Sequence, residues 1–282
     1  MRLVRIGPAG SEKPAVIDAK GQYRDVSSLC GDFNAEFFAS GGIQSLRDVD
    51  LAVLPVLSGD LRVGAPIARP GNLVAVGLNY ADHAREANME IPAEPLLFNK
   101  APNTVIGPND DIHFPRGGVK VDWEVELGFV IGTTCRYLES PEVSLSHIAG
   151  FVAINDVSER VFQAERGGQW VKGKAFETSC PTGPWLVTPD DPSIPEYFDL
   201  WLDVNGVRRQ TGSTSNLIFD IATVLHYISQ VMVLDPGDLV ITGTPPGVGM
   251  GMSDPTWLKV GDLVTLGVSA LGEQRNRVVE AP

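Results

Sequence analysis

Two acidic side chains one residue apart, Glu124 and Glu126, interrupt the apolar run Val-Asp-Trp-Glu-Val-Glu-Leu-Gly-Phe-Val-Ile at residues 121–131. Alternate side chains of a strand share a face, so both carboxylates point one way while Trp123 and Val125 point the other. Two ionised carboxylates this close are costly to desolvate unless a metal ion or basic side chains compensate them. With no histidine or cysteine nearby, oxygen ligation favours Mg²⁺, Mn²⁺ or Ca²⁺ over zinc. The pair predicts a site for a hard cation, the alternative being an edge strand whose glutamates face water.

A third carboxylate, Asp156, stands where a strand-like segment, Gly150–Ile154, runs into a predicted helix from about Val157 to Glu165. Arg160 and Gln163 follow at offsets of four and seven, which places all three along one helical face. By itself, Asp156 would be interpreted as a helix N-cap and Arg160 as a solvated cation. Beside the glutamate pair, Asp156 becomes a third oxygen ligand that leaves coordination positions open for substrate or water.

A histidine and a glutamate, His83 and Glu86, are three residues apart in Gly-Leu-Asn-Tyr-Ala-Asp-His-Ala-Arg-Glu (77–86) and would meet on one helical turn. A carboxylate that accepts a hydrogen bond from one ring nitrogen raises the basicity of the other, which can then deprotonate water. An ordinary surface pair is the alternative.

Two further segments could bring polar groups to a site. Lys174 follows Gly173 between aromatic residues, where an ammonium could face a cavity; a solvated loop lysine is the alternative. The glycine-rich run 243–251 lacks the Gly-Lys-Ser/Thr of a phosphate loop, and its two prolines remove amide donors. We expect a tight loop that presents the Thr244 hydroxyl.

The composition limits the class of protein. With 282 residues, 43% of them hydrophobic and 20% charged, the chain can bury a substantial core. A net charge of −13 argues against nucleic acid. We expect no membrane span or signal peptide and a cytoplasmic location, because no apolar run approaches roughly 18 residues. The three cysteines lie far apart and indicate neither a disulfide framework nor a zinc site.

The strand-like segments predict an α+β, mostly β fold. Residues 1–66, with short strand-like pieces and a helical stretch near 33–47, predict a small N-terminal α+β domain. In residues 67–282, short β-rich runs favour a rolled or sandwich-like mixed β domain over a doubly wound sheet, with one helix from about Leu217 to Val231. The β-rich runs are Leu73–Val76, Asp122–Ile131, Gly150–Ile154, Gly183–Val187, Leu200–Val204, Leu239–Thr242 and Asp262–Val268.

Four segments, in this order, resemble the fumarylacetoacetate hydrolase superfamily over roughly residues 70–270. They are Asp-Trp-Glu-Val-Glu-Leu-Gly, Asn-Asp-Val-Ser-Glu-Arg, Gly-Lys-Ala-Phe-Glu-Thr-Ser-Cys-Pro-Thr-Gly-Pro-Trp and Thr-Gly-Thr-Pro-Pro-Gly-Val-Gly. The chain departs from the family pattern where Gly-Lys-Ala-Phe-Glu-Thr replaces Gly-Lys-Gly-Phe-Asp-Thr and where Lys100-Ala101 replaces Lys-Pro. The longer similarity is to bacterial hydrolases of 2,4-diketo-3-deoxy sugar acids such as L-rhamnonate and L-fuconate derivatives, whose relatives are often labelled ureidoglycolate lyase.

This resemblance implies a β-rich catalytic domain rolled around a Mg²⁺ or Mn²⁺ site, commonly assembled as a homodimer. It implies His83 and Glu86 as a water-activating pair on a lid that orders with substrate, and Lys174 as the lysine facing the reacting carbonyl. The implied metal ligands are Glu124, Glu126 and Asp156. The residues implied around the substrate are Arg160, Gln163 and Thr244, to which we add Tyr80 from the segment that carries His83.

The function expected from these features is metal-assisted C–C cleavage of a 2,4-diketo acid to pyruvate and a second acid, such as lactate. Alternatives within the superfamily are decarboxylation of oxaloacetate, acylpyruvate cleavage and isomerisation. An alternative from another class is a non-catalytic, metal-dependent binding protein.

Overall fold

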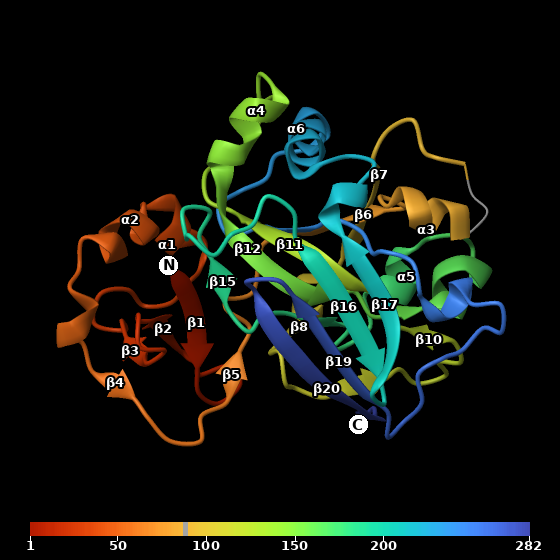
Figure 1. Ribbon diagram of the computed structural model, residues 1–282, viewed down its shortest axis with the longest axis horizontal. Coiled ribbons are helices and arrows are strands. Elements are labelled where there is room, and N and C mark those ends of the chain that lie inside the picture. Colours follow the sequence, from red (N-terminus) through yellow and green to blue (C-terminus); the bar gives the residue numbers. More distant parts are fainter. Residues whose placement is uncertain (87–89) are drawn as a thin grey trace.

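The computed structural model describes residues 1–86 and 90–282, apart from the side chain of His83 (Figure 1). Most of its regular structure is β, as predicted. The larger of two main sheets has the strand order β4-β3-β2-β1-β15-β12-β11-β18-β6-β7, with β5 also paired to β1. Its strands are β1 (Arg2–Ile6), β2 (Lys13–Ile17), β3 (Tyr23–Asp25), β4 (Val56–Leu57), β5 (Val63–Gly64), β6 (Leu73–Gly77), β7 (Leu96–Lys100), β11 (Val125–Ile131), β12 (Ile148–Asn155), β15 (Leu186–Val187) and β18 (Leu239–Ile241).

The second main sheet has the order β17-β16-β19-β20-β9 and lies over β11 and β12, with β16 and β17 in cyan and β19 and β20 in blue in Figure 1. Its strands are β9 (Ile112–Phe114), β16 (Asp199–Val204), β17 (Val207–Ser213), β19 (Leu263–Val268) and β20 (Gly272–Glu280). Two short pairs are β10 (Val121–Asp122) with β13 (Ser158–Glu159), and β8 (Val105–Ile106) with β14 (Cys180–Pro181). The α-helices are α1 (Ala35–Ala39), α2 (Gly42–Arg47), α3 (Ala81–Glu86), α4 (Pro141–Ser144), α5 (Val171–Lys174) and α6 (Ile221–Val231), and Val161–Glu165 forms a π-helical turn.

The main core lies between the two sheets and confirms the period-two pattern of the 121–131 run. Trp123, Val125, Leu127 and Phe129 are fully buried in one apolar cluster with inward side chains of the second sheet, such as Leu266. The opposite face of β11 is left for Glu126 and Gly128. Antiparallel pairing of β11 with β12 sets Val125 opposite Asn155 and Glu126 opposite Ile154, so the polar ends of the two strands meet.

The predicted helix from Val157 to Glu165 is wrong in its first half. Ser158 and Glu159 form strand β13, which pairs with β10, and only Val161–Glu165 is helical, as a π-helical turn. Asp156 is therefore not a helix N-cap, and offsets along one helical face do not bring it near Arg160. The strand pair β10–β13 instead brings Arg160 to Asp122.

Other predicted elements are present with changed bounds. The helical stretch near 33–47 is two short helices, α1 and α2, separated at Gly41, whose φ of 74° lies in the left-handed region. The predicted strand Gly183–Val187 shrinks to Leu186–Val187, and the predicted Leu217–Val231 helix begins at Ile221. Strands β7, β17 and β20 were not predicted.

The N-terminal segment and the rest of the chain share one sheet. Strand β1 pairs with β2 on one side and, through Arg2 and Leu3, with β15 on the other. Leu3 is fully buried in the same apolar cluster as Leu73 and Ile154. The boundary at residues 66 and 67 stays a prediction. Within the described ranges, the structure has no helix long and apolar enough to cross a membrane.

The shared cluster predicts that the N-terminal segment stabilises the whole molecule. Leu3→Ala should lower the free energy of unfolding by about 2–5 kcal/mol, because it opens a cavity in a closed core. Chemical denaturation should show a single transition shifted to lower denaturant, while Val53→Ala, at a side chain that is 75% exposed, should leave the midpoint unchanged. Two transitions, of which only one moves, would show that the segments unfold independently.

Candidate metal centre

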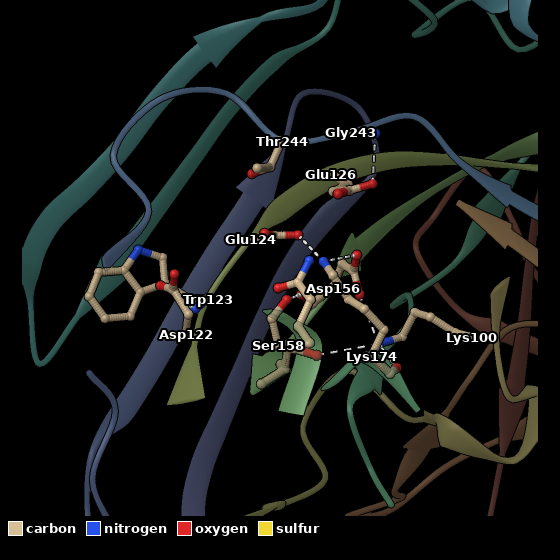
Figure 2. Close-up of polar contacts among 12 residues, drawn as sticks. Lys100, Asp122, Trp123, Glu124, Glu126, Asp156, Ser158, Lys174, Gly243 and Thr244 are labelled. Carbon is tan, nitrogen blue, oxygen red and sulfur yellow. Dashed lines mark hydrogen bonds and ion pairs between the residues drawn. The ribbon is translucent and has the colours of Figure 1, made fainter. Parts of the chain in front are cut away.

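Three carboxylates converge where β11 and β12 meet (Figure 2). Glu124 immediately precedes β11, Glu126 lies within it, and Asp156 immediately follows β12. The backbone N–H of Asp156 donates a 2.8 Å hydrogen bond to the carbonyl of Glu124, which fixes the two strand ends together. One carboxylate oxygen from each residue lies within 4.8 Å of the others, and all three residues are buried. The structure therefore brings together the three predicted metal ligands.

Lys174 lies among these carboxylates. Its Nζ is 2.5 Å from Glu124 Oε2 and 2.5 Å from Asp156 Oδ2. It is the last residue of α5, whose close approach requires Gly173: a Cβ there would lie 2.3 Å from the Glu159 carbonyl oxygen. Lys174 is thus a buried lysine and not a solvated loop residue. Burial lowers its pKa, but the neighbouring carboxylates outweigh burial and raise it, so the side chain remains an ammonium.

A second cation, Arg160, links the centre to a fourth buried carboxylate. Its Nη2 lies 2.6 Å from Glu124 Oε1 and 2.7 Å from Asp122 Oδ2, and its Nη1 donates to Gln163 Oε1 at 3.0 Å. Asp122 also accepts hydrogen bonds from the N–H groups of Gly249 and Met250. It therefore ties Arg160 to the glycine-rich loop.

A third cation, Lys100, contacts the far side of Asp156. Its Nζ is fully buried, 2.8 Å from Asp156 Oδ1, and it donates to the carbonyl oxygens of Lys174 and Val157 and to Ser179 Oγ. Lys100 therefore contacts both Asp156, a predicted metal ligand, and the last residue of α5. As the last residue of β7 it is aimed inward by the sheet.

The charges leave one carboxylate uncompensated. Burial raises the pKa of Glu124, but Lys174 and Arg160 outweigh it and lower the value to about 2. Burial, then the Asp156 and Glu124 charges, raise the pKa of Glu126 well above its ordinary value. Within the described ranges Glu126 forms no ion pair, and its Oε2 accepts only a 2.8 Å hydrogen bond from Gly243 N–H.

The donor set fits a hard divalent ion. Three buried carboxylates supply oxygen ligands of the kind that Mg²⁺ and Mn²⁺ prefer, and a bound cation would stabilise the ionised form of Glu126. Lys174, Arg160 and Lys100 contact both oxygens of Glu124 and both oxygens of Asp156, and so neutralise part of the acidic cluster.

The centre forms the floor of a cavity of about 130 Å³. Six of the predicted site residues line it: Glu124, Glu126, Arg160, Gln163, Lys174 and Thr244. The Thr244 hydroxyl donates to the Val125 carbonyl and accepts from Gln210 Nε2, so it is held in place by β11. A larger cavity of about 380 Å³ lies against α1 and α2, away from these groups.

The remaining predicted residues lie on or beside α3. The Glu86 carboxylate accepts a hydrogen bond from Gly247 N–H, at 3.1 and 3.2 Å to its two oxygens, which ties α3 to the glycine-rich loop. The His83 side chain lies outside the described part of the structure, so the His83–Glu86 pair stays a prediction. Tyr80 is fully buried, and its hydroxyl has no hydrogen-bond partner in the described ranges.

Sequence reasoning missed Lys100, Asp122 and Gln210 as parts of this site. A signal existed for Asp122, because residues 122, 124 and 126 are all acidic at alternate positions of one segment. Lys100 and Gln210 carry no such signal, since each reaches the site only through sheet pairing with distant strands.

Comparison with known proteins gives the family to which these mixed β-sheets around a buried acidic centre belong. Residues 72–279 match the family described as "Fumarylacetoacetate (FAA) hydrolase C-terminal". The chain belongs to this family. A Burkholderia ambifaria protein named "Putative hydrolase" is 50% identical over 275 residues, covering 97% of each chain.

Three solved structures are similar to this chain, and each similarity covers 100% of both chains. They are a fumarylacetoacetate hydrolase from Exiguobacterium antarcticum (37% identity, TM-score 0.88), a 5-carboxymethyl-2-hydroxymuconate delta-isomerase from Mycobacterium smegmatis (32%, 0.76) and a maleylpyruvate hydrolase from Sphingobium sp. SYK-6, solved with manganese(II) and pyruvate (26%, 0.81). The predicted fold and superfamily are confirmed.

The Lys100 contacts predict a role in metal affinity. Lys100→Met should weaken Mn²⁺ binding, measured by calorimetry, by roughly tenfold or more, because Asp156 loses the group that orients it. Lys120→Met, which removes an exposed ion pair with Glu165, is the matched control and should bind Mn²⁺ normally. Unchanged affinity in a folded Lys100→Met protein would show that Asp156 needs no such support.

The raised pKa of Glu126 predicts opposite effects on stability and on metal binding. The metal-free folded state holds this proton more tightly than the unfolded state, so stability falls as pH rises through the ordinary carboxyl pKa toward the folded pKa. Glu126→Gln should therefore raise the metal-free melting temperature at pH 8 while reducing Mn²⁺ affinity by more than a hundredfold. A lower melting temperature at pH 8 would contradict the assignment of uncompensated charge to this residue.

Proposed function

We propose that the chain is a Mg²⁺- or Mn²⁺-dependent hydrolase that cleaves a carbon–carbon bond of a 2,4-diketo acid, releasing pyruvate and a second acid. The observation that carries this proposal is the buried carboxylate triad, two of whose members, Glu124 and Glu126, line a cavity. The manganese and pyruvate reported with the maleylpyruvate hydrolase neighbour support it by analogy.

Glu124, Glu126 and Asp156 would hold the metal. When bound, the ion would supply Lewis-acid stabilisation of the negative charge that develops on the α-keto acid end of the substrate. The three carboxylates lie within or next to two paired strands and are buried, which limits their movement.

His83, Glu86 and Lys174 would carry out the remaining steps of the reaction. His83, oriented by Glu86, would take a proton from water as the water oxygen bonds to C4. The bond between C3 and C4 then breaks, its electron pair remains with C3, and a proton added at C3 completes pyruvate while C4 becomes a carboxylate. Lys174, kept charged by its neighbours, would face the oxyanion at C4.

For the distal part of the substrate, we propose a 2,4-diketo-3-deoxy sugar acid such as a rhamnonate or fuconate derivative, with lactate as the second product. The basis is the sequence similarity alone, since the triad addresses only the keto-acid end. Assembly as a homodimer is likewise a proposal.

A second candidate is isomerisation or decarboxylation at the same centre, and the isomerase from Mycobacterium smegmatis among the structural neighbours favours keeping it. A Mg²⁺-dependent assay with acylpyruvates, oxaloacetate and diketo-deoxy sugar acids, scored for pyruvate release, separates hydrolysis from decarboxylation, while isomerisation releases no pyruvate from any of them. If only oxaloacetate yields pyruvate, together with carbon dioxide, the hydrolase proposal fails.

Water activation gives the sharpest mutational test. His83→Ala and Glu86→Gln should each lower kcat for 2,4-diketo acid hydrolysis by roughly 10²–10⁴-fold, the usual contribution of general-base catalysis. Both variants should bind Mn²⁺ as the wild type does, because neither residue is a proposed ligand. Turnover that survives in both variants would rule out the water-activating pair, and no turnover in the wild type would favour a metal-dependent binding protein.

A further inference from the structure

The cavity above the metal centre has a charged floor and an apolar wall. The floor carries the carboxylates and their cations. The wall comes from three separate parts of the fold: β6, β7 and the segment from the π-helical turn to α5, with one residue of the glycine-rich loop. The apolar residues that line it are Val76, Leu78, Phe98, Ala164, Trp170 and Met250.

Trp170 can take its place in the wall because residue 77 is a glycine. A Cβ at Gly77 would lie 2.7 Å from Cζ3 of the Trp170 indole and 3.1 Å from a methyl group of Leu96. No side chain can therefore occupy position 77 unless the indole moves. The strand and the indole are fitted to each other, so the wall is a built feature of the cavity.

Phe98 makes the wall continuous with the reacting end of the site. Its ring contacts the Trp170 indole edge-on, with centroids 5.3 Å apart at 62°. The Lys174 ammonium lies 5.1 Å from the Phe98 centroid. A substrate whose C4 oxygen faces Lys174 would therefore direct the group attached to C4 along Phe98 toward Trp170.

The cations that line the cavity are already paired. Arg160 contacts Asp122 and Glu124, and Lys174 contacts Glu124 and Asp156. Among the described lining residues there is no further cation. A second substrate carboxylate laid against the aromatic wall would lose its hydration without gaining a partner, which is unfavourable.

Resting on the function proposed above, we infer that Phe98 and Trp170 form the subsite for the C4 substituent and select an uncharged, apolar group over a carboxylate. Among diketo sugar acids this favours a chain that ends in a methyl group. Dicarboxylic substrates should be rejected by desolvation at this wall and not by the metal centre, which holds the keto-acid end in every case.

The test compares three 2,4-dioxo acids with Mn²⁺-loaded enzyme: 2,4-dioxopentanoate, 2,4-dioxoheptanoate and 2,4-dioxoheptanedioate. The last two have chains of equal length and differ by a terminal carboxylate. We expect kcat/KM for the heptanoate to exceed that for the heptanedioate by roughly tenfold or more. Trp170→Ala and Gly77→Ala, which remove or displace the indole, should lower kcat/KM for the heptanoate by roughly tenfold and change that for the pentanoate by less than about threefold.

Trp201→Phe, in the second sheet and outside the cavity lining, is the control and should preserve all three values. Equal or faster turnover of the heptanedioate by the wild type would overturn this inference while leaving the proposed hydrolase intact, because pyruvate is still released. Equal losses on pentanoate and heptanoate in the Trp170 and Gly77 variants would overturn it as well. If no 2,4-dioxo acid yields pyruvate, the proposed function fails and the inference fails with it.

Discussion

Electrostatic repulsion among buried carboxylates is the constraint on which the rest of the site depends. Glu124, Glu126 and Asp156 lie within a few ångströms of one another in a region with little solvent, and such a cluster is stable only when positive charge surrounds it. Lys174 supplies that charge through ion pairs with Glu124 and Asp156, while the pKa of Glu126 stays raised. The chain thus folds with an acidic centre that is nearly neutralised and still favours one more cation.

The surrounding fold explains how these groups are held. The β11–β12 pair sets the positions of the carboxylates, and the same pairing places the apolar side of β11 against the second sheet. Lys100 and Arg160 contact the outer oxygens of the centre from β7 and from the turn after β13. Because each cation comes from a different element, the centre also links β7, β13 and α5. The same strands therefore fix both the apolar packing of the core and the positions of the charged side chains, so a change in strand pairing would alter both.

The sequence predicted the centre better than it predicted the elements around it. Alternation in the 121–131 run, together with the acid at 156, identified the three converging carboxylates. The helix expected from Val157 was wrong because Ser158 and Glu159 pair with β10, a contact between segments about 37 residues apart that local periodicity does not report. The sequence did not decide whether Lys174 faces a cavity or is a solvated loop lysine, because its burial depends on how closely Gly173 lets α5 approach β13.

By itself, the sequence determined which residues could do chemistry and which face of one strand they occupy, because the period of a strand is a local property. It also determined the family, through four motifs in order. Only the tertiary structure decided that Lys100 and Asp122 belong to the site, that Lys174 is buried between two carboxylates, and that Trp170 packs against Gly77. These contacts join segments distant in the chain, and their energies depend on burial and on distances that no spacing along the sequence encodes.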